Sequence, residues 1–331
     1  MASFLRQQFR DKAFGKVFPA VPTPWTSAGL LHEEAQEKYV RHLAATGVGG
    51  AAVWAHTGRG LHIPREVRLK TMRSWRRAFS DGRLLIAGVG AYPDRSLSDG
   101  AMKAKFLDDT RQMADDAVSC GADAFLIYAP IAWRDAPDQD EMVYSYHKML
   151  AEYGKPLVLF YLYREAGGIS YSPELLSKLL AIPQAVAIKV ATLDSVTTFQ
   201  DVEAAIRREQ PDLTLITGED RMVGYTYMCG AGAALIGMGS ACTTPQVEMT
   251  DAWFKGDYAK FVKESAKVDA YSMVTFAKPL DRYIIRMLWS LVAEGVIPEE
   301  AANDPMGCSL GKGEIGLIKS TIESMGWLGR K

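Results

Sequence analysis

Short apolar runs alternate with longer amphipathic segments along the first two-thirds of the chain. The apolar runs are rich in β-branched residues, which is typical of short buried strands. We expect strands at residues 17–21, 51–54, 84–87, 124–128, 157–161, 185–190, 213–217 and 233–236. The segments between them repeat apolar positions at helical spacing, and Gly and Pro mark their boundaries. We expect helices at residues 33–46, 65–79, 102–120, 139–153, 173–180, 196–208 and 221–229.

Strands that alternate with helices in this way predict parallel βα units. Eight such units close naturally into a (β/α)8 TIM barrel, an α/β fold. An open doubly wound sheet is the alternative, but no glycine-rich dinucleotide fingerprint follows the first predicted strand. We therefore favour the barrel.

The rest of the chain shows no strand-like run and reads as helical, at residues 245–267, 278–294 and 311–325. We expect an N-terminal extension at 1–15, the barrel at 16–243, and a C-terminal helical extension at 244–331 packed on the barrel. Residues 1–10 are compatible with a short amphipathic helix that packs on the barrel or on another subunit.

Composition changes this picture little. The chain has 331 residues, of which 48% are hydrophobic and 23% charged, with a formal net charge of -1. That is ordinary for a globular protein, and no basic surplus suggests nucleic acid or an anionic membrane as partner. No run is long enough for a membrane span, and the start lacks a signal-peptide core. The four cysteines show neither CxxC pairing nor zinc spacing, which favours a reducing cytoplasm.

A single lysine stands in the apolar stretch of the predicted sixth strand. Strand alternation sends Ala187, Lys189 and Ala191 to one face and the bulkier residues between them to the other. We therefore expect Lys189 to point into the barrel, with space around its amine. Burial lowers the pKa of an ammonium, and a neutral lysine amine is the nucleophile of Schiff-base catalysis. The structural alternative is a strand-end lysine that reaches solvent along its flexible stem.

The fifth predicted strand ends in Tyr161. Neighbouring parallel strands place Tyr161 and Lys189 at similar heights, where a phenol can pass protons to and from atoms bound at the amine. The alternative is a rim aromatic residue with a solvated hydroxyl.

The second predicted strand runs into a short turn that contains His56, Thr57, Gly58 and Arg59. A hydroxyl beside successive backbone N–H groups makes an anion pocket that suits a substrate carboxylate. An ordinary βα turn would look the same. His56 is either a proton carrier or a polar turn residue, and the polar-turn role is favoured because no partner is visible.

Gly218, Glu219 and Asp220 follow the seventh predicted strand, and Gly237 follows the eighth. Both turns are placed at the mouth of the barrel, where barrel enzymes hold their sites. The glycines allow close approach of a ligand to the backbone. The acidic side chains suit substrate hydroxyls, although helix capping is the expected role of Asp220. We see no clustered metal ligands, and expect neither a metal ion nor a cofactor.

Several short motifs follow one another in a specific order, together with the spacing between Tyr161 and Lys189. They are Phe18-Pro-Ala-Val-Pro-Thr-Pro24, Ala55-His-Thr-Gly-Arg59, Leu85-Ile-Ala-Gly-Val-Gly90, Ile188-Lys189, Gly218-Glu-Asp220 and Gly232-Ala-Ala-Leu-Ile-Gly237. In this combination the chain resembles the dihydrodipicolinate synthase/N-acetylneuraminate lyase superfamily, from about Val17 to the final helix. The resemblance implies a barrel with a helical C-terminal extension, usually a homotetramer, that forms a Schiff base with a 2-oxo acid. It implies Lys189 as the Schiff-base lysine and Tyr161 as the catalytic tyrosine.

The turn after the second strand departs from the family pattern. Thr57 occupies the position of the family's second threonine, which implies that it holds the 2-oxo acid carboxylate. His56 stands where the family has a first threonine in a proton relay, and Arg59 stands where it has a glutamate.

The loops after the fourth and fifth strands also depart from the synthases. Leu162 replaces an asparagine, and Ala166 replaces the arginine that binds the second substrate. Arg164 is a candidate substitute for that arginine. The stretch that ends in Trp133 lacks the tyrosine used across a subunit contact. These differences argue against a 4-hydroxy-tetrahydrodipicolinate synthase.

We predict a lyase or hydro-lyase acting on a pyruvate-type 2-oxo acid or a 2-keto-3-deoxy sugar acid. Lys189 forms the imine, Tyr161 moves protons, and Thr57 with the N–H groups around Gly58 holds the carboxylate. The remaining substrate-binding candidates are His56, Arg164, Gly218 and Gly237, with Trp54, Trp133 and Tyr163 near the distal end. The expected assembly is a homotetramer or homodimer.

Three alternatives remain open. The chain could be a catalytically degenerate barrel that binds a 2-oxo acid as a sensor, because the relay and turn residues differ. It could be a true synthase, or a metal-dependent aldolase that loses activity to a chelator.

Overall fold

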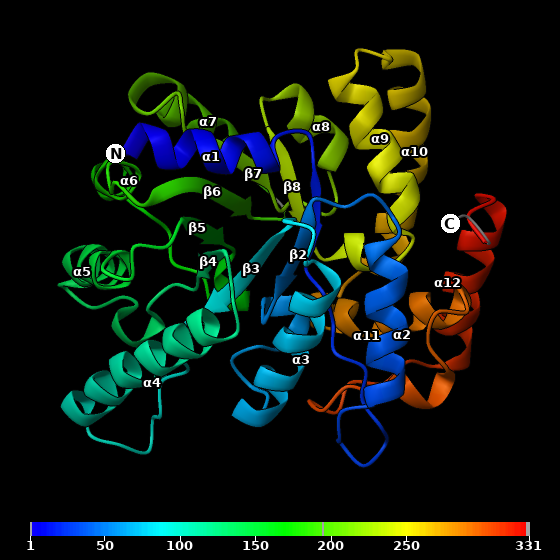
Figure 1. Ribbon diagram of the computed structural model, residues 1–331, viewed down its shortest axis with the longest axis horizontal. Coiled ribbons are helices and arrows are strands. Elements are labelled where there is room, and N and C mark those ends of the chain that lie inside the picture. Colours follow the sequence, from blue (N-terminus) through cyan, green and yellow to red (C-terminus); the bar gives the residue numbers. More distant parts are fainter. Residues whose placement is uncertain (1, 194, 329–331) are drawn as a thin grey trace.

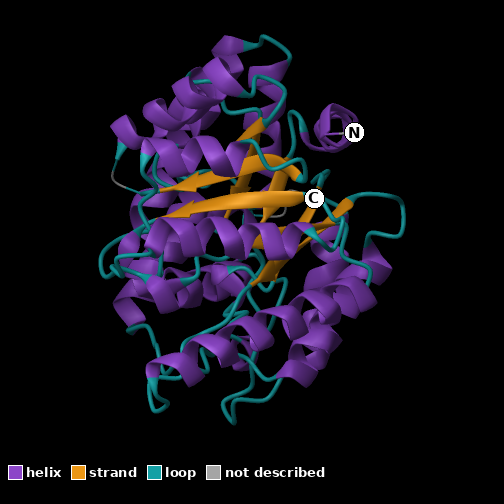
Figure 2. Ribbon diagram, turned by 90° about the vertical axis from the view of Figure 1, so that its left-hand side faces the viewer, coloured by secondary structure: helices purple, strands orange, loops and turns teal. Residues whose placement is uncertain are grey.

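The computed structural model describes residues 2–193 and 195–328, and its centre is a closed barrel of parallel strands surrounded by helices (Figures 1 and 2). The strands pair in the order β1-β8-β7-β6-β5-β4-β3-β2. A parallel bridge between Ala20 and Ala52 joins the two edges, and the Val21 N–H donates to the Ala52 carbonyl at 3.1 Å. The barrel prediction is therefore confirmed, and the open sheet is wrong. The strands are β1 (Val17–Pro19), β2 (Gly50–Val53), β3 (Leu84–Val89), β4 (Ala124–Ile127), β5 (Leu157–Leu162), β6 (Ala185–Ala191), β7 (Thr214–Thr217) and β8 (Ala233–Ile236).

The strands read as continuous apolar runs because both of their faces are buried. Side chains such as Phe18, Ile86, Leu126 and Leu235 fill the inside of the barrel. The alternate side chains form a larger cluster with the surrounding helices. The lumen is thus a packed core.

The helices predicted between the strands are all present, with ends that differ by a few residues. They are α2 (Glu33–Ala44), α3 (Arg65–Ala78), α4 (Asp99–Ser119), α5 (Gln139–Ala151), α6 (Pro173–Leu180), α7 (Val196–Glu209) and α8 (Val223–Met228). Capping interactions fix the residue at which several of these helices begin. At α6, for example, the Ser172 hydroxyl accepts the Leu175 N–H at 3.1 Å and Pro173 takes the first turn.

The chain after the barrel is helical, as expected, and its helices gather on one side of the barrel (Figure 1). They are α9 (Thr243–Phe254), α10 (Tyr258–Thr275), α11 (Tyr283–Ala293) and α12 (Lys312–Ser324). The single helix predicted over residues 245–267 is wrong. Gly256 leaves helical geometry with φ +76°, and the Asp257 carboxylate accepts the Lys260 N–H at 3.1 Å to begin a new helix.

The first residues form the expected amphipathic helix, α1 (Ala2–Ala13), which packs on the barrel (Figure 1). Phe9 and Ala13 join the apolar cluster of the barrel interior. Arg6, which is 3% exposed, donates to the carbonyls of Ala185 and Leu180 at 2.9 and 2.8 Å. Because Ala185 begins β6, α1 covers the end of the barrel where the strands start. The domain limits at residues 15 and 243 stay predictions.

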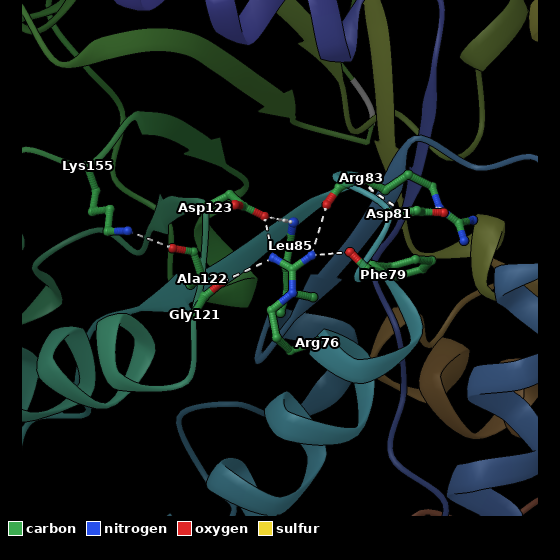
Figure 3. Close-up of polar contacts among 9 residues, drawn as sticks. All are labelled: Arg76, Phe79, Asp81, Arg83, Leu85, Gly121, Ala122, Asp123 and Lys155. Carbon is green, nitrogen blue, oxygen red and sulfur yellow. Dashed lines mark hydrogen bonds and ion pairs between the residues drawn. The ribbon is translucent and has the colours of Figure 1, made fainter.

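A polar network ties β3 to β4 at that same end (Figure 3). The Asp123 carboxylate accepts the Leu85 N–H and one guanidinium N–H of Arg76, each at 2.8 Å. The Lys155 ammonium donates to the Ala122 carbonyl at 3.1 Å. Interactions at the start of barrel strands serve stability, which leaves the opposite end for chemistry.

Candidate active site

Two adjoining spaces lie at the end of the barrel where the strands finish. The larger is a cavity of about 1100 Å³, and the smaller has a volume of about 20 Å³, enough for roughly one water molecule. Both are lined by His56, Tyr163, Leu193 and Phe276, which therefore stand between them. Polar side chains concentrate around the smaller space, where His56 and Tyr163 are joined by Thr57, Lys189, Asp220 and Tyr283.

Lys189 lies inside the barrel and borders the small space, as its position in the strand predicts. It is only 6% exposed. Ala187 and Ala191 share the interior with it, whereas Ile188 and Val190 pack toward the outer helices. The alternative of a lysine that reaches bulk solvent is therefore wrong.

The register between β5 and β6 decides which residue lies level with Lys189. Val186 is an extra residue on β6 that the pairing skips near the start of the two strands. Beyond this bulge Phe160 pairs with Lys189, and Tyr161 pairs with the next residue. A shift of one residue exchanges the two faces of a strand, so Phe160 points into the barrel and Tyr161 points out of it.

Tyr161 consequently lies away from the amine, and the prediction that its phenol stands beside Lys189 is wrong. Its ring packs edge-on against Tyr171 with centroids 5.0 Å apart, among the side chains outside the barrel. It lines neither the cavity nor the smaller space. The physical cause is the bulge on β6, which the sequence spacing does not reveal.

The surroundings of Lys189 favour the neutral amine. Burial lowers its pKa to about 8, and the nearby carboxylates of Asp220 and Glu219 oppose this effect. Its Nζ lies 4.3 Å from the centroid of the Phe160 ring. About a tenth of the amine is thus unprotonated at pH 7, far more than for an exposed lysine.

The two acidic residues after β7 are both buried, and each accepts backbone N–H groups. Glu219 accepts from Thr192 and Leu193 at 2.7 and 2.6 Å. Asp220 accepts the Met238 N–H at 2.7 Å, and burial raises the pKa of its carboxyl to about 7. Asp220 therefore bridges the turns after β7 and β8, and the prediction that it caps the next helix is wrong.

The turn after β2 forms a short 3₁₀ segment, η1 (His56–Gly58), whose side chains meet a residue from the C-terminal helices. The Tyr283 hydroxyl lies 2.9 Å from His56 Nδ1 and 3.0 Å from Thr57 Oγ1. Burial and the charges of Arg59 and Lys189 lower the pKa of His56 to about 3, so its imidazole is neutral. His56 therefore has the polar partner that the sequence alone did not show.

Sequence reasoning missed Tyr283 because it lies in an apolar helical tail, far along the chain from the barrel strands. No motif marks it. The backbone of Gly237 makes room for it, since a Cβ there would stand 2.9 Å from its ring and 3.0 Å from Thr57 Oγ1. Gly218 does the same for Lys189, because a Cβ would stand 2.3 Å from Lys189 Cε.

The Gly58 N–H is used within its own turn, where it donates to the Ala55 carbonyl at 2.9 Å. The expectation that it is free for a substrate carboxylate is therefore wrong. The Thr57 hydroxyl, 2% exposed, and the His56 imidazole are the polar groups that this turn directs to the small space.

Three predicted residues lie outside the cavity. Arg164 forms an ion pair with Asp135, and both side chains are exposed. Trp133 packs edge-on against Phe106, and the Trp54 indole donates to the Arg68 carbonyl. The cavity instead has Tyr163, as expected, together with Arg59 from the turn after β2. Two further cationic residues, Arg221 and Lys278, were not singled out by the sequence.

Arg59 is not free to bind an anion, because it pairs with Asp304 of the C-terminal segment. The Arg59 Nε lies 3.3 Å from an Asp304 carboxylate oxygen, and the Asp304 side chain is 1% exposed. This pair fixes the turn after β2 to the C-terminal helices, as the Tyr283 contacts also do.

Among residues 2–193 and 195–328, no three His, Cys, Asp or Glu side chains are placed together so that they could hold a metal ion. Within the same ranges, no helix combines the length and apolar character needed to cross a bilayer.

Comparison with known proteins shows which family the chain matches. Residues 13–310 match the model of the dihydrodipicolinate synthetase family. A 4-hydroxy-tetrahydrodipicolinate synthase from Thermosynechococcus vestitus is 26% identical over 324 residues, covering 95% of this chain and 98% of that protein.

Two solved structures resemble the fold. One is a prophage protein of the dihydrodipicolinic acid synthase family from E. coli K12 in complex with pyruvate, with TM-score 0.81, 18% identity, and coverage of 94% of this chain and 98% of that one. The other is an N-acetylneuraminate lyase from Mycoplasma synoviae, with TM-score 0.74, 19% identity, and coverage of 95% and 97%. At these identities the two likenesses concern the fold alone.

Proposed function

The chain belongs to the dihydrodipicolinate synthetase family, and from this premise we propose that it is a lyase that acts on a 2-oxo acid through a Schiff base on Lys189. One observation carries the proposal. The Lys189 amine is buried at the end of a barrel strand, borders a water-sized space that adjoins a cavity of about 1100 Å³, and has a pKa lowered to about 8. A neutral amine in such a place is suited to attack a ketone.

The chemistry follows from the amine and its neighbours. The nitrogen of Lys189 adds to the ketone carbon, and loss of water leaves a protonated imine. The imine draws electrons from the neighbouring carbon, so that a C–C or C–O bond one carbon further away breaks. The carboxylates of Asp220 and Glu219, which already favour the charged lysine, favour the positive imine for the same reason.

The small space suits the 2-oxo acid end of a substrate. We assign its carboxylate to the Thr57 hydroxyl, with the room left by Gly218 and Gly237. Because this space holds roughly one water, a residue between the two spaces such as Leu193 must shift to admit a substrate. The remainder of the substrate extends into the larger cavity, where Tyr163, Arg221 and Lys278 offer an aromatic ring and cations.

Borohydride reduction with pyruvate and a series of 2-keto-3-deoxy sugar acids tests the proposal. We expect a stable adduct whose mass maps to the peptide that contains Lys189, together with turnover of at least one of these acids. Lys189→Met should abolish both. Lys319→Met is the matched control, because Lys319 is an exposed lysine of α12 that borders neither space. An adduct on another lysine, or turnover by Lys189→Met, would contradict the assignment.

A second candidate is a barrel that binds a 2-oxo acid without turnover. The observation that favours it is the phenyl ring of Phe160 beside the amine, because a phenyl ring cannot exchange protons. Binding with neither a trapped adduct nor turnover would support this candidate. The relatives named as 4-hydroxy-tetrahydrodipicolinate synthase suggest a third, but Arg164 pairs with Asp135 and does not line the cavity.

A homodimer or homotetramer remains the expected assembly, and sedimentation velocity of the purified chain tests it. A cytoplasmic location also stays a prediction.

A further inference from the structure

We propose that Tyr283, on helix α11 of the C-terminal extension, is the catalytic acid and base of this site. The proposal rests on the Schiff-base function of Lys189 and adds the group that moves protons at the bound substrate. It also gives the C-terminal helices a part in the chemistry, because they supply a side chain that the barrel strands lack.

The position of the Tyr283 hydroxyl is fixed by its neighbours. Its ring stacks between Phe276, with centroids 4.5 Å apart, and His56, with centroids 5.9 Å apart. The hydroxyl lies 2.9 Å from His56 Nδ1 and 3.0 Å from Thr57 Oγ1. The side chain is buried, and the ring fits only because residue 237 is glycine. A preorganised hydroxyl of this kind is what general acid–base catalysis requires.

Tyr283 and Lys189 border the same small space. Its volume of about 20 Å³ is close to that of a single water molecule. An oxygen or carbon atom that occupies this space, while bonded to the carbon attacked by Lys189, is therefore in reach of the phenol.

The other groups that line the small space suit the role less well. Phe160 and Leu162, which β5 directs there, carry no exchangeable proton. The Tyr163 hydroxyl makes no hydrogen bond within the described parts of the chain, and burial raises the pKa of Tyr163 to about 12. Asp220 accepts the Met238 N–H and serves as the counter-charge of Lys189.

Tyr283, in contrast, has a neighbour that can donate to its oxygen while Thr57 holds the substrate carboxylate. In the tautomer with hydrogen on Nδ1, neutral His56 donates to the phenol oxygen across 2.9 Å. Burial raises the pKa of Tyr283. The His56 donor and the positive imine oppose this effect, and they favour the phenolate that must exist between giving and regaining a proton.

The proton transfers balance over the reaction. When the adduct of Lys189 collapses, the nitrogen lone pair forms the C=N bond and the C–O bond breaks. The departing hydroxyl takes the Tyr283 proton and leaves as water, so the positive imine faces a phenolate. The phenolate then removes a proton from the carbon next to the imine, and that C–H electron pair forms the C=C bond of a neutral enamine. Tyr283 is a phenol again.

Exchange of the pyruvate methyl protons in deuterium oxide, followed by NMR, measures the second transfer directly. We expect the wild-type protein to exchange these protons, and Tyr283→Phe to slow the exchange by about 100-fold or more. Borohydride should still trap pyruvate on Lys189 of Tyr283→Phe, although more slowly, because water can supply the proton that the departing hydroxyl takes. Tyr161→Phe is the matched control, and should exchange within about twofold of wild type because its ring lies outside the barrel.

A second variant tests the role of Tyr283 in proton transfer without removing its hydroxyl. Fluorotyrosine at position 283 has a phenol of lower pKa, so the pH dependence of exchange should move to lower pH. A purely structural role for Tyr283 predicts no such movement.

The possible outcomes separate the two proposals. Suppose that wild type traps pyruvate and exchanges its protons, and that Tyr283→Phe exchanges them within about threefold of the wild-type rate. This result would overturn the role of Tyr283 and leave the Schiff base standing. Loss of exchange in Tyr163→Phe but not in Tyr283→Phe would also overturn the role of Tyr283. A wild-type protein that neither traps nor exchanges overturns the Schiff base, and the role of Tyr283 with it.

Discussion

The Nζ of Lys189 stands 4.3 Å from the centre of the Phe160 ring, its partner on the neighbouring strand. An aromatic face attracts an ammonium by roughly 0.5–2 kcal/mol, but it offers no proton. The groups that can exchange protons approach the amine from other directions: the turn after β2, the turn after β7, and helix α11. The nucleophile therefore comes from the middle of the chain, and its proton carriers come from segments on both sides of it.

The first prediction concerns the pH dependence of imine formation. Because burial lowers the pKa of Lys189 to about 8, the neutral amine and the trapping rate should rise with pH and level off above that value. The Asp220 carboxylate raises the pKa of Lys189, so Asp220→Asn should move the midpoint to lower pH. Initial rates of borohydride trapping between pH 5 and pH 10 measure this.

Asp281→Asn is the control for that experiment, since Asp281 is an exposed carboxylate on the cavity wall. Its midpoint should remain that of wild type. A midpoint that rises in Asp220→Asn would show that the sign of the Asp220 effect is wrong.

The second prediction concerns the space around the amine. A Cβ at residue 218 would stand 2.3 Å from Lys189 Cε and 2.9 Å from Ala191 Cβ. Gly218→Ala must therefore displace the lysine, and a displacement of about 1 Å is enough to cost about 100-fold in rate. Gly100→Ala is the matched control, because nothing lies within 4 Å of the added methyl group. Equal trapping rates for the two variants would contradict the observed placement of Lys189.

The sequence was enough to predict the barrel and the position of Lys189, because both depend on local patterns. Eight apolar runs at even spacing predict the strands, and the small residues on either side of Lys189 predict the face on which it lies. The pattern failed at Tyr161, because one extra residue on β6, Val186, changes the register beyond it. A bulge leaves no clear mark in an apolar strand, and its effect is to exchange the two faces.

Long-range contacts were beyond sequence reasoning for a different reason. Tyr283 reaches His56 and Thr57 across more than 220 positions of the chain, and Asp220 reaches Met238 instead of its own helix. These pairings depend on how the C-terminal helices pack on the barrel. Helical periodicity gives a helix and its apolar face, but not the neighbour that the face meets.

The third prediction concerns the ion pair between Arg59 and Asp304. Only 12% of the Arg59 side chain and 1% of the Asp304 side chain are exposed. Removal of one partner from a buried pair leaves an uncompensated charge, so Asp304→Asn should lower the free energy of unfolding by roughly 3 kcal/mol. Urea unfolding followed by circular dichroism measures it.

Glu33→Gln provides the comparison for this pair. Lys70 and Glu33 also form an ion pair, with nitrogen and oxygen 2.7 Å apart, but both side chains are mostly exposed. This variant should leave the free energy of unfolding close to that of wild type, because water screens an exposed pair. Equal losses in the two variants would show that Arg59 is stabilised in some other way.

The fourth prediction concerns the helix that covers the other end of the barrel. Arg6 is the one charged residue of α1 that is buried, and it donates to the Leu180 and Ala185 carbonyls and to the side chains of Gln210 and Asp212. Arg6→Met keeps much of the apolar stem but leaves buried acceptors without donors. Each such acceptor costs about 1–3 kcal/mol, so the free energy of unfolding should fall by roughly 2–4 kcal/mol.

The same variant separates stability from chemistry. Arg6 contacts the start of β6, whereas Lys189 stands near the end of that strand. The trapping rate per folded molecule should therefore remain close to that of wild type, although the protein unfolds at lower urea. Lys12→Met, which alters an exposed residue of the same helix, should affect neither quantity. If Arg6→Met is as stable as Lys12→Met, the hydrogen bonds of Arg6 do not hold α1 against the barrel.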